Sequence, residues 1–485
     1  MSRCLVFFWV LSWALPAWAQ SVLGPRQAVE IALRENPTLA AAVASMKRAN
    51  WVAIGEDAAF TPTLELDVGA LHSESPAFRN GDITRAGVDQ LTVGSRLIQR
   101  LRLGTDVSLR VEHNSRWEET REDVSLFAVG PVYDTSARLE LTHPFWRGSG
   151  RKVVEAALRQ ARGAATEAER AAERTASALV RDVLVAWWEL WYADETLRIE
   201  QASLLLAEQQ RDEARRRVEL GSEAPVAVLT FETRVAERLE GVASAKRQQQ
   251  ERALALAALL GTATTEVETE APTFEAPSIP EEEEARRLAV ERSPEVREAE
   301  AALALAATRA EVTADPFRPR LDVQGFAQAG GLSSAYAGFS GDQFAWVAGV
   351  NLIFETPLSA TRYRAARAQA RLSVQEADRR LAQARLSAEA GVDAERARLD
   401  SARARVELAE KTLEFAEAQF AAEQRKYEIG TSTPIEVLQA EEAVRSARLR
   451  LARAQVDLRS AEAAIEHLTG RLVEKWVGPA LAEAF

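Results

Sequence analysis

The sequence repeats one phrase, and this repeat limits the possible folds more than any other feature. RVELGSEAPVAVLTF begins at Arg217, and KYEIGTSTPIEVLQA begins at Lys426. Glycine, proline and leucine take matching places in both stretches, and the match runs without a gap to Leu260-Gly261 in one and Thr469-Gly470 in the other. A long internal repeat means that one structural unit is built twice. We therefore expect two similar halves.

Matches nearer the N-terminus extend the repeat. AVEIALRENPTL from Ala28 matches ARRLAVERSPEV from Ala285, and FTPTLEL from Phe60 matches FRPRLDV from Phe317. Each half reads as two short helices, a proline-marked change to strand, a β region and two long helices. The predicted organisation starts with a signal peptide at 1–19 and a first repeat at 20–261, which has strands in about 62–143 and a coiled-coil hairpin in about 149–260. A linker at 262–284 leads to the second repeat at 285–470, which has strands in about 321–355 and a hairpin in about 360–469. A tail follows at 471–485.

The N-terminus has the pattern of an export signal. Arg3 precedes an apolar run, and Ala17-Trp18-Ala19 forms a small-x-small cleavage site. The only cysteine, Cys4, lies within this segment, so we expect a mature chain without disulfides or thiol ligands. The formal net charge of -12 and the lack of basic runs argue against a nucleic-acid partner.

The long helical stretches carry apolar residues seven positions apart. One arm places Val392, Leu399, Val406, Leu413, Phe420 and Tyr427 at this spacing, and the next places Val437, Val444, Leu451, Leu458 and Ile465. The first half keeps the pattern, with Arg211 and Gln249 as exceptions. Two heptad arms joined by a short turn predict an antiparallel coiled-coil hairpin. An arm of about 65 residues would reach about 100 Å.

The repeated phrase falls at the turn of each hairpin. Gly221 and Gly430 suit the end of a helix, and Pro225 and Pro434 suit the first turn of the next one. Ser222 or Thr431 could cap the following helix. These residues could also serve only to make the turn, and this is the alternative to a role in binding a partner.

The β regions alternate between apolar and polar residues. In FAWVAGVNLIF, every second residue from Phe344 to Phe354 is apolar, and aromatic residues stand at both ends. Elsewhere, apolar positions alternate with the charged residues Glu65, Asp67, Arg110, Arg138 and Glu140. This pattern predicts outer-membrane strands with a wet inner face, and a soluble sandwich is the alternative. Beyond the signal, no stretch approaches the 18 apolar residues of a membrane helix.

The number of strands decides how many copies assemble. The second half offers strands at about 321–328 and 344–355, and the first at about 62–72 and 133–143, with a probable extra pair beside Leu103 to Asp106. Four to six strands cannot close a membrane barrel, and lipid does not tolerate open edges. Several copies must therefore close it together.

These features resemble the TolC-type outer membrane factors, the outer membrane efflux protein family. The resemblance covers nearly the whole mature chain. Its repeat order is highly specific, although each motif alone, such as the phrase from Tyr427 to Ala440, is weak. It implies a homotrimer with a twelve-stranded β-barrel in the outer membrane, continued by an α-helical barrel in the periplasm. The expected fold class is thus a mixed α and β membrane protein. Two departures are the lack of a lipidated N-terminal cysteine and the long first β region.

The resemblance also implies roles at the tips. Tip turns dock a periplasmic adaptor, or membrane fusion protein, which is linked to an inner-membrane transporter. The expected docking residues are Gly221, Pro225, Leu229, Tyr427, Gly430, Pro434 and Leu438. Acidic side chains ring the family's periplasmic constriction, where this chain has Glu436 and Gln439. A ring of three Glu436 side chains would favour cations and could bind a blocking metal. A solvated carboxylate at a helix start is the alternative.

Other tip positions depart from the family. Its tip tyrosine is kept as Tyr427, but the usual partner positions hold Ala227 and Ser432. This puts the family's closed-state lock in doubt. Glu441 and Glu442 are expected on ordinary surface.

Signatures of enzymes are missing from the sequence. The histidines His72, His113, His143 and His467 are scattered, and no HExxH, CxxC, G-x-S-x-G or phosphate-binding loop occurs. We predict no catalytic residue, no cofactor and no metal site.

The predicted function is a passive exit duct of a tripartite efflux pump or a type I secretion system. We expect it in the outer membrane of a Gram-negative cell, in contact with lipid, with most of the chain in the periplasm. Cargo selection would lie mainly with the pump and the adaptor. The alternatives are a periplasmic adaptor, which would have one hairpin and a glycine-rich β-sandwich, and a structural envelope spacer without a wet interior.

Overall fold

The structure, a computed structural model, describes residues 22–79, 82–122, 125–221, 224–262, 268–272, 279–334, 336, 339 and 343–477. The predicted signal peptide lies outside these residues, as do parts of the predicted linker and tail. The chain divides into two units. The first, called the helical unit, comprises residues 1–44, 170–298 and 383–485, and the second, called the sheet unit, comprises residues 45–169 and 299–382.

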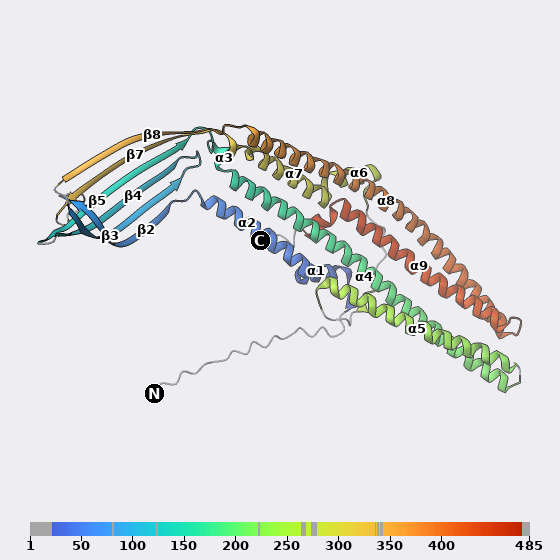
Figure 1. Cartoon of the computed structure of the whole chain (residues 1–485). Coiled ribbons are helices and arrows are strands. Elements are labelled where there is room, and N and C mark those ends of the chain that lie inside the picture. The colour runs from blue at the N-terminus through green and yellow to red at the C-terminus, as the bar shows by residue number, and fades with distance from the viewer. Residues whose placement is uncertain are drawn as a thin grey trace, which may run out of the picture. The chain divides into compact units, whose positions relative to one another are not determined.

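Six described strands form one antiparallel sheet in the sheet unit (Figure 1). Four come from the first half and two from the second, so the extra pair on either side of Leu103 to Asp106 is present. The order β2-β3-β4-β5-β7-β8 follows the chain. The strands are β2 (Thr63–Arg79), β3 (Asp82–Arg100), β4 (Asp106–Glu122), β5 (Ser125–Pro144), β7 (Arg320–Ser333) and β8 (Gln343–Glu355).

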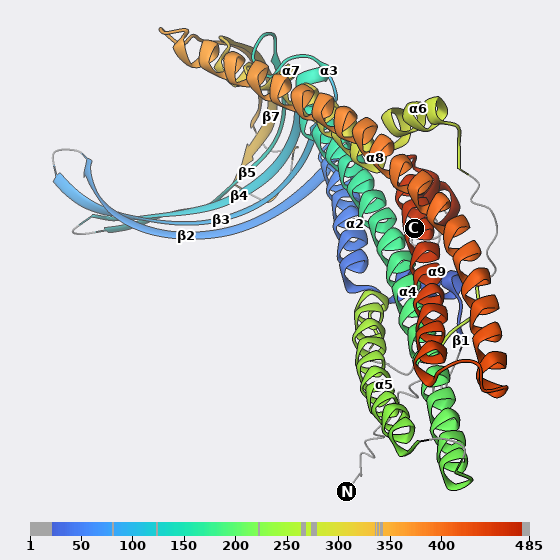
Figure 2. The same cartoon turned by 90° about the vertical axis from the view of Figure 1, so that its right-hand side faces the viewer.

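The two faces of this sheet differ in polarity. Side chains alternate between the faces along each strand, and the register places apolar residues of neighbouring strands mostly on one face and polar residues mostly on the other. The strands also curve along their length (Figure 2). One face, called the apolar face, carries Leu64, Leu66, Val68, Val93, Leu97, Leu109, Val111, Leu139, Leu141, Val323, Trp346, Val350 and Leu352. The other, called the polar face, carries Glu65, Asp67, Thr92, Arg96, Arg110, Glu112, Asn114, Arg138, Glu140 and Gln324.

The five charged residues singled out from the sequence therefore share one face. On the apolar face, Trp346 is 74% and Val350 is 75% exposed. So much exposed apolar surface has no counterpart in a soluble sheet with one wet face, where the apolar side is covered.

Long helices dominate the rest of the chain. None of the described helices is both long and apolar enough to cross a membrane. The helices are α1 (Pro25–Glu35), α2 (Pro37–Ala58), α3 (Arg151–Val154), α4 (Ala156–Glu219), α5 (Pro225–Leu260), α6 (Glu282–Arg292), α7 (Pro294–Val312), η1 (Asp315–Phe317), α8 (Thr361–Glu428), α9 (Pro434–Leu468) and η3 (Val473–Val477). The short strands β1 (Val22–Leu23) and β6 (Glu268–Thr269) pair in parallel.

In the helical unit, α4 lies beside α5 and α8 lies beside α9 (Figures 1 and 2). The heptad residues of the second pair face one another. Leu399 of α8 packs with Ala461 and Ile465 of α9, and nearer the turn Ala416 packs with Val444 and Ala447. These contacts lie at the predicted heptad positions, and the coiled coil itself remains a prediction.

A buried tryptophan cluster joins α1, α4, α5 and α9. Trp187 is fully buried, and its indole Nε1 donates a hydrogen bond of 2.8 Å to the carbonyl of Leu23. Trp188 meets Trp187 edge to face at 4.9 Å between ring centroids. The cluster thus ties the first described residues of the chain to its long helices.

Two glycines close the hairpins against the short helices. Gly261 ends α5 with φ at +74°, and a Cβ there would lie 2.5 Å from the carbonyl oxygen of Glu35. Gly470 also has φ at +74°, and its Cβ would lie 2.5 Å from the carbonyl oxygen of Arg292. Only glycine satisfies both the left-handed conformation and the close approach.

We predict that Gly261→Ala destabilises the protein more than Gly430→Ala. Gly430 also has positive φ, but nothing lies within 4 Å of its added Cβ, so alanine there meets only the backbone cost of about 1–2 kcal/mol. Gly261→Ala adds a clash with main chain, which cannot move aside easily. Thermal unfolding of both variants in detergent measures the difference. Equal losses would mean that the contact with Glu35 is loose.

Candidate functional site at the hairpin tips

The tips of both hairpins are built around a left-handed glycine. Gly221 has φ at +70° and Gly430 has φ at +77°, and a Cβ on either would meet open space. After α8, the amide of Gly430 donates to the carbonyl of Tyr427, and the amide of Thr431 donates to the carbonyl of Lys426 at 2.8 Å. These bonds satisfy the last carbonyls of the helix, as in a Schellman turn.

The helices that leave the tips begin with proline. Pro225 opens α5 and Pro434 opens α9, as expected. The prediction that Thr431 caps α9 is wrong, because Thr433 occupies the N-cap position and the Thr431 hydroxyl donates back to the carbonyl of Lys426. The cap has to stand directly before the proline. Ser222 lies outside the described residues.

Glu436 completes a capping box with Thr433. Its Oε2 accepts bonds from the Thr433 amide at 2.8 Å, the Thr433 hydroxyl at 3.0 Å and the Ser432 hydroxyl at 2.9 Å. The Thr433 amide contributes most to lowering the pKa of Glu436, followed by the Ser432 and Thr433 hydroxyls. The carboxylate is thus ionised at neutral pH, and it is held at the start of α9 while remaining exposed.

Gln439 lies on an open groove between α5 and α9. This groove has a volume of about 540 Å³. Its other lining residues are Thr230, Thr233, Arg234, Glu237, Ile435, Leu438 and Glu442. Because Gln439 is uncharged, it does not form an acidic pair with Glu436 in one chain. The place of both residues at a constriction remains a prediction about the assembled protein.

Tyr427 contacts the other hairpin through an arginine that the sequence did not suggest. The guanidinium of Arg217 on α4 lies over the Tyr427 ring, with its central carbon 4.4 Å from the ring centroid. Arg217 also donates to the Tyr427 carbonyl at 3.4 Å. Of the positions expected to hold its partners, Ala227 is buried and Ser432 bonds to Glu423 and Glu436. A cation–π contact therefore joins the two tips.

The apolar tip residues divide into an exposed rim and an inner contact. Leu229 is 62% exposed, whereas Leu438 is 8% exposed and packs with Ala214 and Phe231. Leu438 thus joins the two hairpins and is not available at the surface. The exposed residues, called the apolar rim, are Leu220, Val226, Leu229, Ile429 and Ile435.

Above the tips, a buried charge cluster links the hairpins. Glu200 of α4 accepts from Arg445 of α9 at 2.6 Å and lies 3.5 Å from Arg238 of α5. Glu442 bonds to both of these arginines. A Cβ on Gly241 would lie 2.8 Å from the Glu200 carboxylate, so this glycine leaves the room that Glu200 occupies.

Glu441 is the unusual member of this cluster. It is 4% exposed, and neither of its carboxylate oxygens has a hydrogen-bond partner among the described residues. Burial raises its pKa, although Arg234 and Arg238 pull it down. The expectation of ordinary surface is wrong for Glu441, whereas Glu442 is half-buried and bonded to Arg238 and Arg445. The heptad pattern did not predict the burial of Glu441, because Arg234 and Arg238 near it come from the other hairpin.

Residues 285–471 match the family model described as Outer membrane efflux protein. The second half of the chain therefore resembles this family. The matched segment holds the second hairpin with Tyr427, Gly430 and Pro434, so the expected tip phrase lies within the matched region.

Solved outer-membrane channels are similar to this chain in fold. The CmeC channel of Campylobacter jejuni shares 13% identity at a TM-score of 0.67, over 92% of this chain and 85% of that chain. VceC of Vibrio cholerae shares 19% at 0.65, over 92% and 96%. The open state of the MtrE channel of Neisseria gonorrhoeae shares 19% at 0.62, over 92% and 88%. No curated protein matches the chain.

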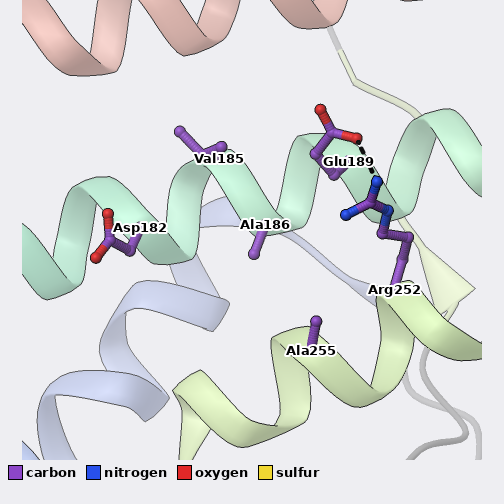
Figure 3. Close-up of a pocket in the computed structure, with 6 residues that line it drawn as sticks. All are labelled: Asp182, Val185, Ala186, Glu189, Arg252 and Ala255. Atoms are coloured by element: carbon purple, nitrogen blue, oxygen red, sulfur yellow. Dashed lines mark ion pairs between the residues drawn. The ribbon is translucent and has the colours of Figure 1, made fainter.

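A second hollow lies between α4 and α5. It measures about 270 Å³ and is lined by Asp182, Val185, Ala186, Glu189, Arg252 and Ala255. Figure 3 shows Ala186 and Ala255 pointing toward one another, and Glu189 paired with Arg252 at 3.6 Å. Its one close charge pair is satisfied internally. We assign it no ligand.

His467 takes part in a Ser-His-Glu arrangement that is structural. Its Nδ1 lies 2.8 Å from the Ser177 hydroxyl, and its Nε2 lies 3.2 Å from Glu295. Burial opposes the charged form of Glu295, but His467 and Ser293 outweigh it and lower the pKa of Glu295 to about 2. Ser177 is fully buried and His467 is 2% exposed, so no substrate can reach them. The described residues also contain no cluster suited to a metal ion.

We predict that Glu441→Gln gains stability over the wild type as the pH rises. A carboxyl whose pKa is raised by folding stabilises the fold in acid, and this contribution is lost as the pH rises through the raised pKa. Near pH 4 both side chains are neutral, so the difference should be smallest there. As the pH rises through the raised pKa, Glu441 gains a charge that has no donor among the described residues, so the glutamine variant should unfold at a higher temperature relative to wild type.

Thermal unfolding in detergent between pH 4 and pH 8 measures this difference. Glu407→Gln is the control, because Lys411 lowers the pKa of Glu407 on the surface of α8. The control difference should therefore run weakly in the opposite direction. A Glu441→Gln difference that does not change with pH would show that Glu441 keeps the same charge throughout.

Proposed function

We propose that this chain is the outer-membrane exit duct of a tripartite efflux pump or a type I secretion system, through which substrates pass passively. The match of residues 285–471 to the outer membrane efflux protein family supports the proposal, and so does the similarity in fold to solved outer-membrane channels. The observation that carries it is the two-faced sheet. Its apolar face is exposed and its polar face is charged, as required of a wall between lipid and water. The proposal assigns no catalytic step to the chain.

In this proposal, three copies assemble in the outer membrane. Among the described strands, β2 pairs only with β3 and β8 pairs only with β7, so each sheet has two free edges. Unpaired backbone groups are very costly in hydrocarbon, and joining the edges of neighbouring copies satisfies them. The hairpins of the internal repeat, packed as coiled coils, would then form the periplasmic α-helical barrel.

The tips are proposed as the place where the periplasmic adaptor docks. The apolar rim supports this, because five exposed large apolar side chains at the end of two hairpins are surface that a partner would cover. Leu438 faces inward and would support the tip without touching the adaptor. The adaptor would be linked to an inner-membrane transporter, which supplies the energy and selects the cargo.

The alternative functions fit less well. A periplasmic adaptor should have one helical hairpin and a β-sandwich, whereas the described chain has two hairpins and one curved sheet. A spacer without a pore would have no use for a charged polar face, whose residues include Asp67, Arg110 and Glu140.

We predict that the protein fractionates with the outer membrane as a trimer. Density-gradient separation of the cell envelope gives its location, and the mass of the detergent-extracted particle gives the number of copies. A soluble protein or an inner-membrane monomer would rule out the duct.

We predict that Leu229→Asp abolishes adaptor binding and leaves the trimer intact. A carboxylate at the centre of an apolar contact costs about 2 kcal/mol or more, or roughly thirtyfold in affinity. Ala243→Asp is the matched control, because Ala243 is exposed two heptads away on the same helix. Cross-linking in cells, followed by identification of the captured partner, measures binding. Equal capture by both variants would mean that the rim is not the docking surface.

We predict that Glu436→Gln weakens cation preference in planar bilayers and lowers block by a trivalent cation. Because Glu436 also belongs to a capping box, Thr433→Ala serves as the control. It removes the cap, at a cost of about 1 kcal/mol, but keeps the carboxylate. If Glu436→Gln conducts and is blocked as wild type, while both variants lose stability alike, Glu436 acts only as a cap.

A further inference from the structure

The number of strands in the sheet affects the width of the proposed duct. A twelve-stranded barrel made by three copies uses four strands from each, whereas each chain here has six described strands in one sheet. We propose that the trimer closes an eighteen-stranded barrel, in which the β3–β4 hairpin forms part of the wall. This inference rests on the proposed duct and concerns the size of its outer section.

The hydrogen-bond register places β3 and β4 inside the sheet. β3 pairs with β2 from Asp82 to Ile98 and with β4 from Arg85 to Arg100. β4 pairs in turn with β5, with one irregularity between Arg116 and Glu118. If the hairpin lay outside the wall, β2 and β5 would have to pair directly. They are instead separated by two strands that are paired along most of their length.

The side chains of β3 and β4 continue both faces of the wall. Val93 and Leu97 of β3 are each 44% exposed and share the apolar face with Leu109 of β4, which is 42% exposed. Residues next to these, Thr92 and Arg96, lie on the polar face. A flap in water would gain nothing from a row of exposed apolar residues aligned with those of β2 and β5.

A polar network crosses from β2 to β4 over a glycine. Asp67 of β2 lies 3.6 Å from Arg110 of β4, and it passes over Gly94 of β3, where a Cβ would be 2.5 Å from the Asp67 carboxylate. Arg110 also pairs with Glu112 at 2.7 Å. Charged groups that bond across an intervening strand fix that strand within the same polar surface.

The same surface continues on either side of this pair. Asn114 of β4 accepts from the Thr92 hydroxyl at 2.6 Å, and Glu140 of β5 bonds to Gln324 of β7. Polar contacts therefore join β2, β3 and β4 on this face, and a further contact joins β5 and β7 on the same face. This is the arrangement of a lumen lined by all the strands.

The number and length of the strands allow closure. β2 and β8 stand at the two edges, and because six is even, β8 of one copy runs antiparallel to β2 of the next. The strands have 13 to 20 residues, more than the 9–11 that cross an outer membrane. Three copies would thus close an all-antiparallel barrel whose apolar face points to lipid all round.

The strand number sets the width of the barrel. With strands about 4.8 Å apart and tilted by about 40°, eighteen strands give a backbone radius of about 18 Å, against about 12 Å for twelve. Barrels of 16–18 strands leave an open aqueous channel. The outer section of the duct would therefore pass larger cargo than a twelve-stranded barrel, and selection by size would fall to the helical section.

Cysteine labelling of the full-length protein in the outer membrane tests this inference. In a Cys4→Ala background, the adjacent pair Thr92→Cys and Val93→Cys reports on β3, and the pair Ser136→Cys and Ala137→Cys reports on β5. Each variant is treated with a water-soluble maleimide and with a lipid-soluble one, and its particle mass is measured. A density map of the trimer in nanodiscs then counts the strands.

We expect the water-soluble reagent to label positions 92 and 136 several-fold more than positions 93 and 137, and the lipid-soluble reagent to show the reverse. The map should show eighteen strands. If the β5 pair behaves in this way while both β3 positions react with the water-soluble reagent, the hairpin lies outside the wall and the barrel has twelve strands. If the β5 pair also fails, or the particle is not a trimer, the proposed duct itself is wrong.

Discussion

Backbone hydrogen bonding in hydrocarbon is the constraint on which this architecture depends. Water satisfies the edge of a sheet in solution, but lipid cannot, so each strand that crosses a membrane needs a neighbour on both sides. Among the described strands, the sheet has an exposed apolar face and unpaired edges at β2 and β8. In the proposed duct, one copy could not satisfy its own backbone in lipid. The proposed assembly of several copies follows from this constraint, before any contact between helices is considered.

Patterns that depend on neighbours in sequence could be predicted well. The turns at Gly221 and Gly430 follow from the repeated phrase, because a left-handed residue before a proline-started helix is a local requirement. The seam of α8 and α9 follows from the seven-residue spacing, and Leu399 and Val444 are buried where that spacing puts them. The faces of the sheet follow from alternation at Glu65, Asp67 and Arg110.

Features that depend on contacts between distant segments could not be predicted. Glu441 is buried because α4 and α5 pack against α9, and a charged residue beside a heptad position gives no sign of this. The pairing of Arg217 with Tyr427 joins the two hairpins and has no local signal. The full length of β3 and β4 was hidden by His113, Asn114 and Ser115, three polar residues in a row that interrupt the alternation, and by Gly94, which carries no side chain. The sequence therefore indicated an extra pair without showing that it spans the sheet.

The order of strands in the sheet limits how many strands such a chain can gain or lose at one time. β2 starts and β8 ends at the same end of the sheet, because each strand reverses the direction of the one before it. In the proposed duct, adding or removing one strand would place the part of the chain after the sheet on the opposite side of the membrane from the part before it. Strands could therefore be gained only in hairpins. The width of the proposed wall would then change in steps of two strands per copy, or six in a trimer.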